Sequence, residues 1–366
     1  MALAVLQIGA EVAPLATGDL AESVIALARA LAEHGVPTTL IALAPTDADK
    51  PPRGFARRLR KLVVGADEVD LFEGSLARGV ATWLLQPPPG RPPGNALALG
   101  AAAAIEELGV AVTVAHAHGA LAVAALDEVG RVRPSTVRVA TVTDPVGVDA
   151  WADAVVVPSL DPPAGAIGIT PGIDDALWNP ETDPALPTRF SASAPAGKAI
   201  CRRALQRALG LPPRSDLPLF ALSSDAARQR VLETLREGRL VHAQFASPTE
   251  AVSLRMVLGA ADYFIATDEE GDAMNALRAI RYGAVPLAPE GSAASERVVE
   301  YDAPTRTGSG FLFEATTLSD CLFRASRCFS DGETMTLLRG RALSTDVSWR
   351  GPARRYLELF ERLSRE

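Results

Sequence analysis

The chain has 366 residues, of which 48% are hydrophobic and 22% charged, and 36 Lys and Arg residues against 44 Asp and Glu residues give a net charge of −8. This hydrophobic content excludes a disordered chain, and the length predicts about two domains. The acidic balance, with no basic tract, lacks the electrostatic footprint of a nucleic-acid binder and also disfavours an anionic membrane surface as a partner.

Cysteines, histidines and apolar runs exclude further classes. The three cysteines, Cys201, Cys321 and Cys328, are an odd number in a long chain, which disfavours a disulfide framework and fits a reducing compartment. None of the four histidines pairs with a Cys or a carboxylate at a metal-ligand spacing, so we expect no tightly bound transition metal. We also expect no cofactor. The most apolar run, Ala96–Ile105, is shorter than the roughly 20 residues of a membrane span, and the amino-terminal MALAVLQIGAE does not resemble a signal peptide. We therefore expect a cytoplasmic protein.

The first half of the chain alternates strand-like and helix-like segments. Leu3–Ile8 is an apolar run, Asp19–His34 repeats apolar residues at helical spacing, and Thr38–Leu43 is β-rich, which together predict a βαβ unit. Fully apolar strands are typical of a parallel sheet that is covered on both faces. The remaining predictions for this half are strands at Val110–Val114, Val137–Val142 and Ala154–Val157, and a proline-rich surface loop at Gln86–Gly94.

A second alternating series follows a polar, proline-rich stretch from Gly172 to Pro195, where we expect the domain boundary. Two doubly wound α/β halves are therefore predicted. The predicted strands are Leu217–Leu222, Arg239–Phe245, Tyr263–Ala266 and Val285–Ala288, and the predicted helices are Ala226–Glu237 and Asp272–Arg281.

Several segments, in chain order, carry a resemblance to one known family. They are AEVAPLATGDLAESVIALARALAEHG from Ala10, EGSLARGV from Glu73, PGIDDALWNPETDPALPTRFSA from Pro171, GKAICRRALQRALGLP from Gly197, GAADYFIATDEEGD from Gly259, RYGAVPLAP from Arg281, TGSGFLFE from Thr307 and SWRGPARRYLELFERL from Ser348. The family that they resemble is that of the bacterial glycogen and starch synthases, retaining glucosyltransferases that act on ADP-glucose or UDP-glucose.

This resemblance implies a GT-B-like fold, in which two doubly wound parallel-sheet, Rossmann-like domains face each other across a cleft. By resemblance, residues 1–172 form the acceptor-side domain, residues 173–345 form the nucleotide-side domain, and residues 346–366 form a closing helix that crosses back to the first domain.

Position by position, the residues that the family uses in its amino-terminal half are largely replaced. The family's Lys-Thr-Gly-Gly-Leu loop, whose lysine faces the donor phosphates, resembles Ala16–Leu20, where Thr17 and Gly18 remain and the lysine is absent. Asp19 has two readings, because an aspartate there caps the helix and also competes with an anionic ligand for its N–H groups. The family's His-Asp-Trp-His motif resembles His116–Ala120, so His118 is either a candidate catalytic residue or a hydrogen-bonded structural histidine.

In the carboxyl-terminal half, the cations that clamp the donor phosphates in the family are missing from their aligned positions in Ser223–Arg230. Arg228 and Arg230 could replace them, although arginines there are also typical of a solvated helix face. Glu270 aligns with the carboxylate that contacts the donor glucose and is the other candidate catalytic residue. The family's phosphate-binding Thr-Gly-Gly-Leu turn resembles Glu290–Ala293, in which Gly291 and Ser292 are candidate donor-site residues.

The comparison with the synthase motifs is compatible with three functions. The first is a synthase relative that has lost most donor-phosphate contacts and serves as a non-catalytic binding, scaffolding or regulatory protein. The second is an active retaining glycosyltransferase that transfers glucose from a sugar nucleotide to a glucan or another acceptor. The third is a protein that binds a small cationic or neutral metabolite in the interdomain cleft. The partners expected are a protein, or a sugar or sugar nucleotide in the cleft, and neither nucleic acid nor a membrane.

Overall fold

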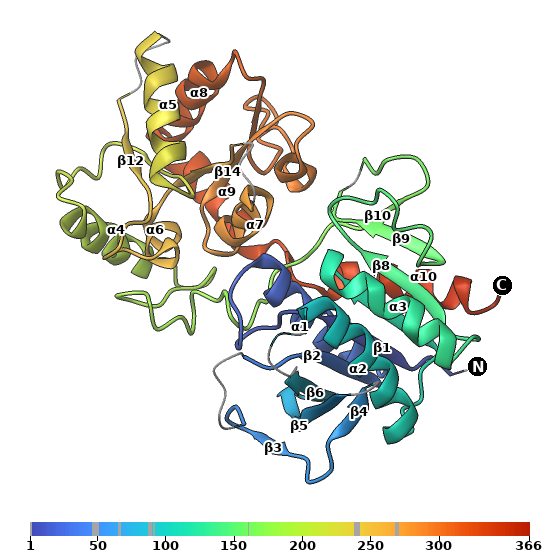
Figure 1. Cartoon of the computed structure of the whole chain (residues 1–366). Coiled ribbons are helices and arrows are strands. Elements are labelled where there is room, and N and C mark those ends of the chain that lie inside the picture. Colours follow the sequence, from blue (N-terminus) through green and yellow to red (C-terminus); the bar gives the residue numbers. More distant parts are fainter. Residues whose placement is uncertain are drawn as a thin grey trace. The chain divides into compact units, whose positions relative to one another are not determined.

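A computed structural model of the chain describes residues 2–45, 51–64, 67–86, 90, 92–159, 161–237, 242–267 and 271–366 (Figure 1). The chain divides into two compact units. Unit 1 comprises residues 1–172 and 349–366, and unit 2 comprises residues 173–348. Each has its own sheet with helices on both faces.

The sheet of unit 1 has the strand order β10-β9-β8-β7-β1-β2-β6-β5-β3, and β4 pairs with β5. All neighbouring strands from β10 to β6 are parallel, whereas β5 pairs antiparallel with β6, β3 and β4. The strands are β1 (Val5–Gly9), β2 (Thr38–Leu43), β3 (Phe55–Arg57), β4 (Leu62–Val64), β5 (Asp67–Ala77), β6 (Val80–Gln86), β7 (Val114–His118), β8 (Val137–Thr141), β9 (Ala154–Val157) and β10 (Ile167–Gly168).

Helices cover both faces of this sheet because its central strands are apolar on both sides. Leu6 and Ile8 of β1 pack in one hydrophobic cluster with α2 (Pro93–Leu108) and α3 (Ala120–Val132). Val5, which points to the opposite face, packs in another cluster with α1 (Asp19–Glu33) and α10 (Arg350–Leu363). The alternation predicted for this half is therefore present, in the form of a parallel sheet buried between helices.

Two predictions for unit 1 are wrong in position. The strand expected at Val110–Val114 is β7 at Val114–His118, where His116 and His118 are buried. The loop expected at Gln86–Gly94 ends earlier, since α2 begins at Pro93, a residue that is well suited to the first helical position.

The sheet of unit 2 is parallel throughout, with the strand order β12-β11-β13-β14-β15. The strands are β11 (Leu219–Ala221), β12 (Gln244–Ala246), β13 (Tyr263–Ile265), β14 (Val285–Pro289) and β15 (Phe311–Phe313). The helices are α4 (Gly197–Ala208), α5 (Asp225–Glu237), α6 (Leu254–Ala260), α7 (Asp272–Arg281), the 3-10 helix η1 (Ala293–Arg297), α8 (Leu318–Ser330) and α9 (Gly332–Ser344).

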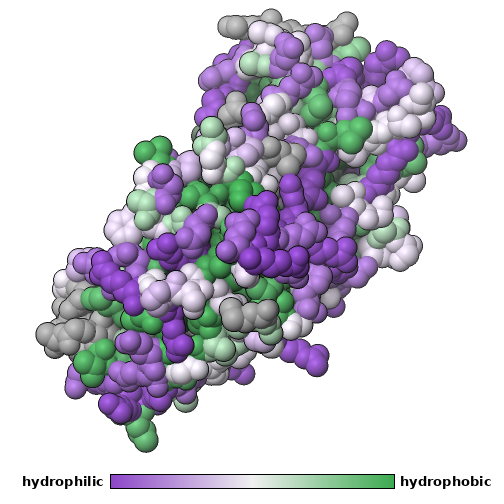
Figure 2. All heavy atoms as spheres, turned by 90° about the vertical axis from the view of Figure 1, so that its right-hand side faces the viewer, coloured by the Kyte–Doolittle hydropathy of each residue, from purple (hydrophilic) through white to green (hydrophobic). Residues whose placement is uncertain are grey.

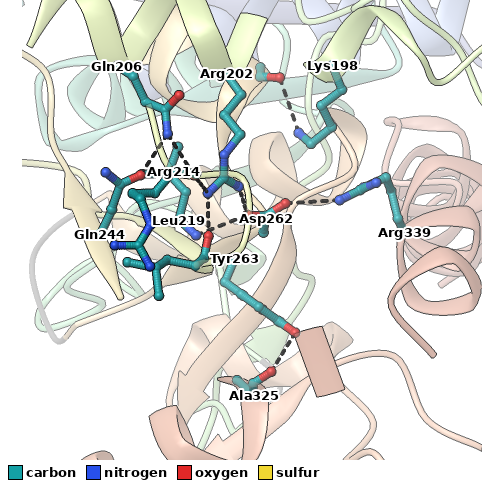
Figure 3. Close-up of polar contacts among 12 residues, drawn as sticks. Lys198, Arg202, Gln206, Arg214, Leu219, Gln244, Asp262, Tyr263, Ala325 and Arg339 are labelled. Atoms are coloured by element: carbon teal, nitrogen blue, oxygen red, sulfur yellow. Dashed lines mark hydrogen bonds and ion pairs between the residues drawn. The ribbon is translucent and has the colours of Figure 1, made fainter. Parts of the chain in front are cut away.

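A buried polar network holds α4 of unit 2 in place (Figure 3). The ammonium of Lys198 donates to the carbonyls of Leu258, Gly259 and Tyr282 at 3.1, 3.3 and 2.7 Å. Every buried donor of this side chain is therefore satisfied.

The carboxylate of Asp262 is the centre of a second group of buried polar contacts of α4. It pairs with the guanidinium of Arg202 and, at 2.9 Å, with that of Arg339 (Figure 3). Its Oδ2 also accepts the backbone N–H of Leu219 at 3.0 Å. These contacts fix α4 and α9 to the ends of two strands of the sheet.

The surface is mixed in polarity. In the view of Figure 2, hydrophilic side chains cover much of the face, and hydrophobic residues appear between them in separate patches. Among the residues that the structure describes, no helix is long and apolar enough to cross a membrane.

Candidate functional site

A pocket opens at the carboxyl edge of the unit 2 sheet, where β13, β14 and β15 end. This is the edge at which parallel α/β sheets bind ligands. Its volume is about 850 Å³, within the range of small-molecule sites. The described residues of its wall are Arg230, Thr234, Ile265, Ala266, Thr267, Pro289, Glu290, Gly291, Ser292, Phe313, Glu314, Ala315 and Leu318.

Three of the predicted donor-site residues meet at this pocket. Arg230 reaches it from α5, and Gly291 and Ser292 reach it from the turn after β14. Gly291 has a φ of 73°, a left-handed conformation that favours glycine. Arg228 is not part of the wall, because its guanidinium is bound to the carboxylate of Asp225 at 2.5 and 2.9 Å.

The hydroxyl groups of the wall donate their hydrogen bonds within the protein. An anionic ligand would have to displace these bonds before it could use the same donors. The three hydroxyl bonds are Thr234 to the Arg230 carbonyl at 3.1 Å, Thr267 to Asp272 Oδ2 at 2.8 Å, and Ser292 to the Pro289 carbonyl at 2.7 Å.

Backbone donors of the wall are engaged in the same way. The N–H of Glu290 donates to the carbonyl of Phe313 at 2.8 Å, and that of Glu314 donates to the hydroxyl of Thr317 at 2.9 Å. The N–H of Ser292 donates to the carbonyl of Pro289 at 3.2 Å. These three N–H groups are therefore already bonded within the protein.

Negative charge outnumbers positive charge on the described part of the wall. Arg230 is its one cation, whereas Glu290 and Glu314 contribute two exposed carboxylates. No described residue pairs with either carboxylate. The wall therefore offers mainly hydrogen-bond acceptors, which suit the hydroxyl or ammonium groups of a ligand better than its phosphates.

The candidate catalytic residue Glu270 lies outside the described residues, as do its acidic neighbours Asp268 and Glu269. The helix α7 begins directly after them, with Gly271 as its N-cap and Asp272 as its first residue. The position of the Glu270 carboxylate stays a prediction.

The loop of Thr17 and Gly18 lies at the carboxyl edge of the unit 1 sheet. Gly18, with a φ of 122°, is the N-cap of α1, and Asp19 is the first helical residue. The prediction of Asp19 as the capping residue is therefore wrong, since a glycine conformation closes the turn one position earlier. Leu20 packs against Gly119, so closely that an added Cβ there would lie 2.8 Å from its Cδ2. The first turn of α1 is thus in contact with the turn between β7 and α3.

His118, the other candidate catalytic residue, ends β7 and is only 3% exposed. Its Nε2 is hydrogen-bonded to Oε1 of Gln7 on β1, and burial lowers its pKa to about 3. The neighbouring His116 has its Nε2 2.7 Å from the hydroxyl of Thr141, and its pKa is also lowered by burial. Both imidazoles are therefore neutral, and their surroundings favour the structural reading of His118.

Some residues of the pocket wall were not predicted from the sequence. Thr234, Thr267 and Glu314 occupy no distinctive motif, and only the sheet topology brings their elements together. Their positions could have indicated a role, because Thr267 and Glu314 follow β13 and β15 within two residues and ligands bind at the carboxyl ends of parallel strands. Over the described ranges, no group of three or more His, Cys, Asp or Glu residues is placed to hold a metal ion.

Known proteins of similar sequence are glycogen synthases. The chain is 27% identical over 241 residues to glycogen synthase 1 of Geobacter sulfurreducens, covering 56% of this chain and 48% of that protein. It is 30% identical over 232 residues to the glycogen synthase of Streptococcus equi subsp. equi, covering 54% and 49%. The matched regions thus span about half the length of these relatives, and no protein-family model matches the chain.

Solved structures of similar shape are glycosyltransferases. The catalytic domain of starch synthase IV from Arabidopsis thaliana, bound to ADP and acarbose, superposes with a TM-score of 0.82 at 20% identity over the whole of both chains. Sucrose-phosphate synthase from Thermosynechococcus elongatus gives a TM-score of 0.55 at 15% identity, over 98% of this chain and 99% of that chain. The protein therefore has the GT-B fold and is similar in sequence to the bacterial glycogen synthases.

Proposed function

We propose that this glycogen/starch-synthase-like protein is a pseudoenzyme, which does not transfer glucose and serves instead as a binding, scaffolding or regulatory protein. The observation that supports this proposal is the chemistry of the unit 2 pocket. Its hydroxyl donors are bonded within the protein, and its described wall has two carboxylates against one guanidinium.

Glucose transfer from a sugar nucleotide requires stabilisation of the diphosphate leaving group. Negative charge accumulates there in the transition state, so cations and free N–H groups have to face it. By resemblance to the synthases, the lysine of the amino-terminal loop is deleted between Ala16 and Thr17, and Ser224 and Gln229 stand at the positions of the other two cations. A charge-assisted hydrogen bond contributes about 1.5–3 kcal/mol. Three lost bonds correspond to about 4–9 kcal/mol, or to a rate lower by roughly 10³–10⁶-fold.

A carbohydrate is the ligand class that we propose for the pocket. Starch synthase IV was solved with ADP and the oligosaccharide analogue acarbose, and it has the same fold. The exposed carboxylates of Glu290 and Glu314 accept hydrogen bonds, which the hydroxyl groups of a sugar supply without adding negative charge. A sugar fits this wall better than a nucleoside diphosphate does.

Calorimetric titration with ADP-glucose and UDP-glucose, together with a glucose-transfer assay on glycogen, tests the proposal. We expect no transfer above background and no donor binding tighter than millimolar. An active glycogen synthase, such as the Geobacter sulfurreducens relative, is the positive control under the same conditions. Measurable transfer that is lost in a Glu270→Gln variant would overturn the proposal and would support the alternative of an active retaining glycosyltransferase.

A further inference from the structure

We propose that Asp272 determines the ligand specificity of the unit 2 pocket, because its buried carboxylate occupies the hydrogen-bond donors that phosphate oxygens would need there. The inference rests on the proposed function, since it names the residue through which the pocket excludes a sugar nucleotide. It concerns a residue that lies behind the pocket wall and not on it.

The buried carboxylate of Asp272 accepts two hydrogen bonds from Thr267. Asp272 is the first residue of α7 and is 1% exposed. Its Oδ2 accepts the backbone N–H of Thr267 at 2.6 Å and the hydroxyl of the same residue at 2.8 Å. Burial raises the pKa of this carboxyl group, and the nearby side chains of Ser223, Thr267 and Asn275 lower it in part.

Asp272 and the residues around it lie at the point of the sheet where the connections on its two sides diverge. Ser223 follows β11 and Thr267 follows β13, and these two strands are parallel neighbours. The strand after β11 in sequence, β12, lies on its other side, so the point between β11 and β13 is the topological switch point of the sheet. Thr267 also belongs to the pocket wall, and it thereby connects Asp272 to the pocket.

Binding of a phosphate at these donors is unfavourable for two reasons. If a phosphate oxygen took the N–H and hydroxyl of Thr267, the buried carboxylate of Asp272 would lose its partners, and an unpaired buried charge is strongly destabilising. The phosphate would also place a second negative charge next to the first. A neutral ligand that donates hydroxyl groups leaves the hydrogen bonds of Asp272 in place and adds no negative charge.

The test uses the full chain and measures binding of inorganic pyrophosphate and of ADP by calorimetry. We expect Asp272→Ala to bind pyrophosphate at least about tenfold more tightly than the wild type, because two charge-assisted donors become free. Asp272→Asn, which removes the charge but keeps an acceptor oxygen, should fall between the two. The control is Glu233→Gln, which removes one negative charge from an exposed position on α5 and should leave the affinity unchanged.

A folded Asp272→Ala variant without gain in affinity would overturn the inference, as would an equal gain in Glu233→Gln, which would reveal an effect of net charge alone. If Asp272→Ala does not fold, the isosteric Asp272→Asn variant is measured instead. We expect it to bind pyrophosphate about threefold more tightly than the wild type or better, and no gain in affinity would overturn the inference. Failure of the proposed function is seen separately, as glucose transfer by the wild type. An inactive wild type with no gain in either variant overturns only the role of Asp272.

Discussion

The buried histidines of unit 1 make its stability depend on pH. Burial lowers the pKa of His118 to about 3, against an ordinary value of 6.5 in the unfolded chain. Between these values the unfolded chain binds more protons, so the free energy of unfolding falls as the pH drops from about 6.5 toward 3. We expect a loss of about 2 kcal/mol from His118 between pH 7 and pH 4.5, measured by urea unfolding.

Two variants separate the contribution of His118 to this pH dependence from that of the Asp and Glu side chains, which also bind protons as the pH falls. His118→Gln should unfold with a shallower pH dependence than the wild type. The exposed His34, at the end of α1, provides the control, because His34→Gln should keep the wild-type slope. Parallel slopes for all three proteins would contradict the assignment of a buried neutral His118.

Lys198 provides a second test at the scale of single residues. Its ammonium is the donor to three buried carbonyl groups of unit 2. Lys198→Met should lower the free energy of unfolding by about 3 kcal/mol or more, because carbonyl groups are left unpaired in the core. Lys61→Met, at an exposed position in unit 1, should change it by less than about 0.5 kcal/mol. Equal effects in chemical denaturation would contradict the structural role of Lys198.

The sequence predicts part of the candidate pocket and misses the rest for a physical reason. Gly291 and Ser292 were found because the turn after a strand retains a glycine that the family uses, and Arg230 was found as one of two possible cations. The sequence does not show which of the two arginines reaches the pocket, because the answer depends on the ion pair of Arg228 with Asp225. Contacts of this kind arise only when the helix is folded.

At the scale of elements, α10 is a structural part of unit 1. Its Tyr356 and Phe360 are buried in one cluster with α1 and the central strands, and the Tyr356 hydroxyl lies 2.9 Å from that of Thr141. Phe360→Ala should destabilise unit 1 by about 3 kcal/mol. Hydrogen exchange should show faster exchange in β1, β7 and β8, with unit 2 unaffected.

The matched control for this helix is Arg354→Ala, which changes an exposed side chain on the same element. It should leave the exchange of both units within experimental error. If Phe360→Ala accelerated exchange in unit 2 as much as in unit 1, the assignment of α10 to unit 1 would be contradicted.

Strongly patterned elements were predicted with correct bounds, and polar strands were not. Thr38–Leu43 and Ala154–Val157 coincide with β2 and β9, and Asp272–Arg281 coincides with α7. The strand β7 was predicted four residues too early, at Val110–Val114, so that His116 and His118 were left outside it. Their burial depends on partners from β1, β8 and α10, which are distant in sequence, and local pattern cannot reveal such partners.

At the scale of the whole molecule, the doubly wound parallel architecture was predictable and the extent of the first sheet was not. The alternation of apolar strands with helices predicts parallel sheets covered on both faces, and both units have them. The antiparallel extension of β3, β4 and β5 was not predicted, although Glu73–Val80, at the junction of β5 and β6, was one of the segments that resemble the family. The pairings of β3 and β4 with β5 join segments that carry no distinctive sequence pattern, so the sequence alone does not reveal them.

The distribution of the hydrophobic clusters predicts how the chain behaves when it is divided. Both clusters of unit 2 consist of residues between Ile173 and Val347. One cluster of unit 1, in contrast, needs Trp349 and the buried face of α10 from the carboxyl terminus. We expect the fragment 173–348 to fold alone and to unfold cooperatively, whereas the fragment 1–172 should be destabilised by the missing helix.

Adding a peptide of residues 349–366 tests the second half of this prediction. The peptide supplies the apolar face of α10, so it should raise the thermal midpoint of the fragment 1–172 in a concentration-dependent manner, as expected for a ligand that binds only the folded state. A peptide with Tyr356→Ala and Phe360→Ala is the control and should have little effect, because both side chains lie in the buried cluster. A fragment 1–172 that is equally stable with and without the native peptide would contradict the prediction and would mean that the remaining clusters of unit 1 are sufficient for its fold.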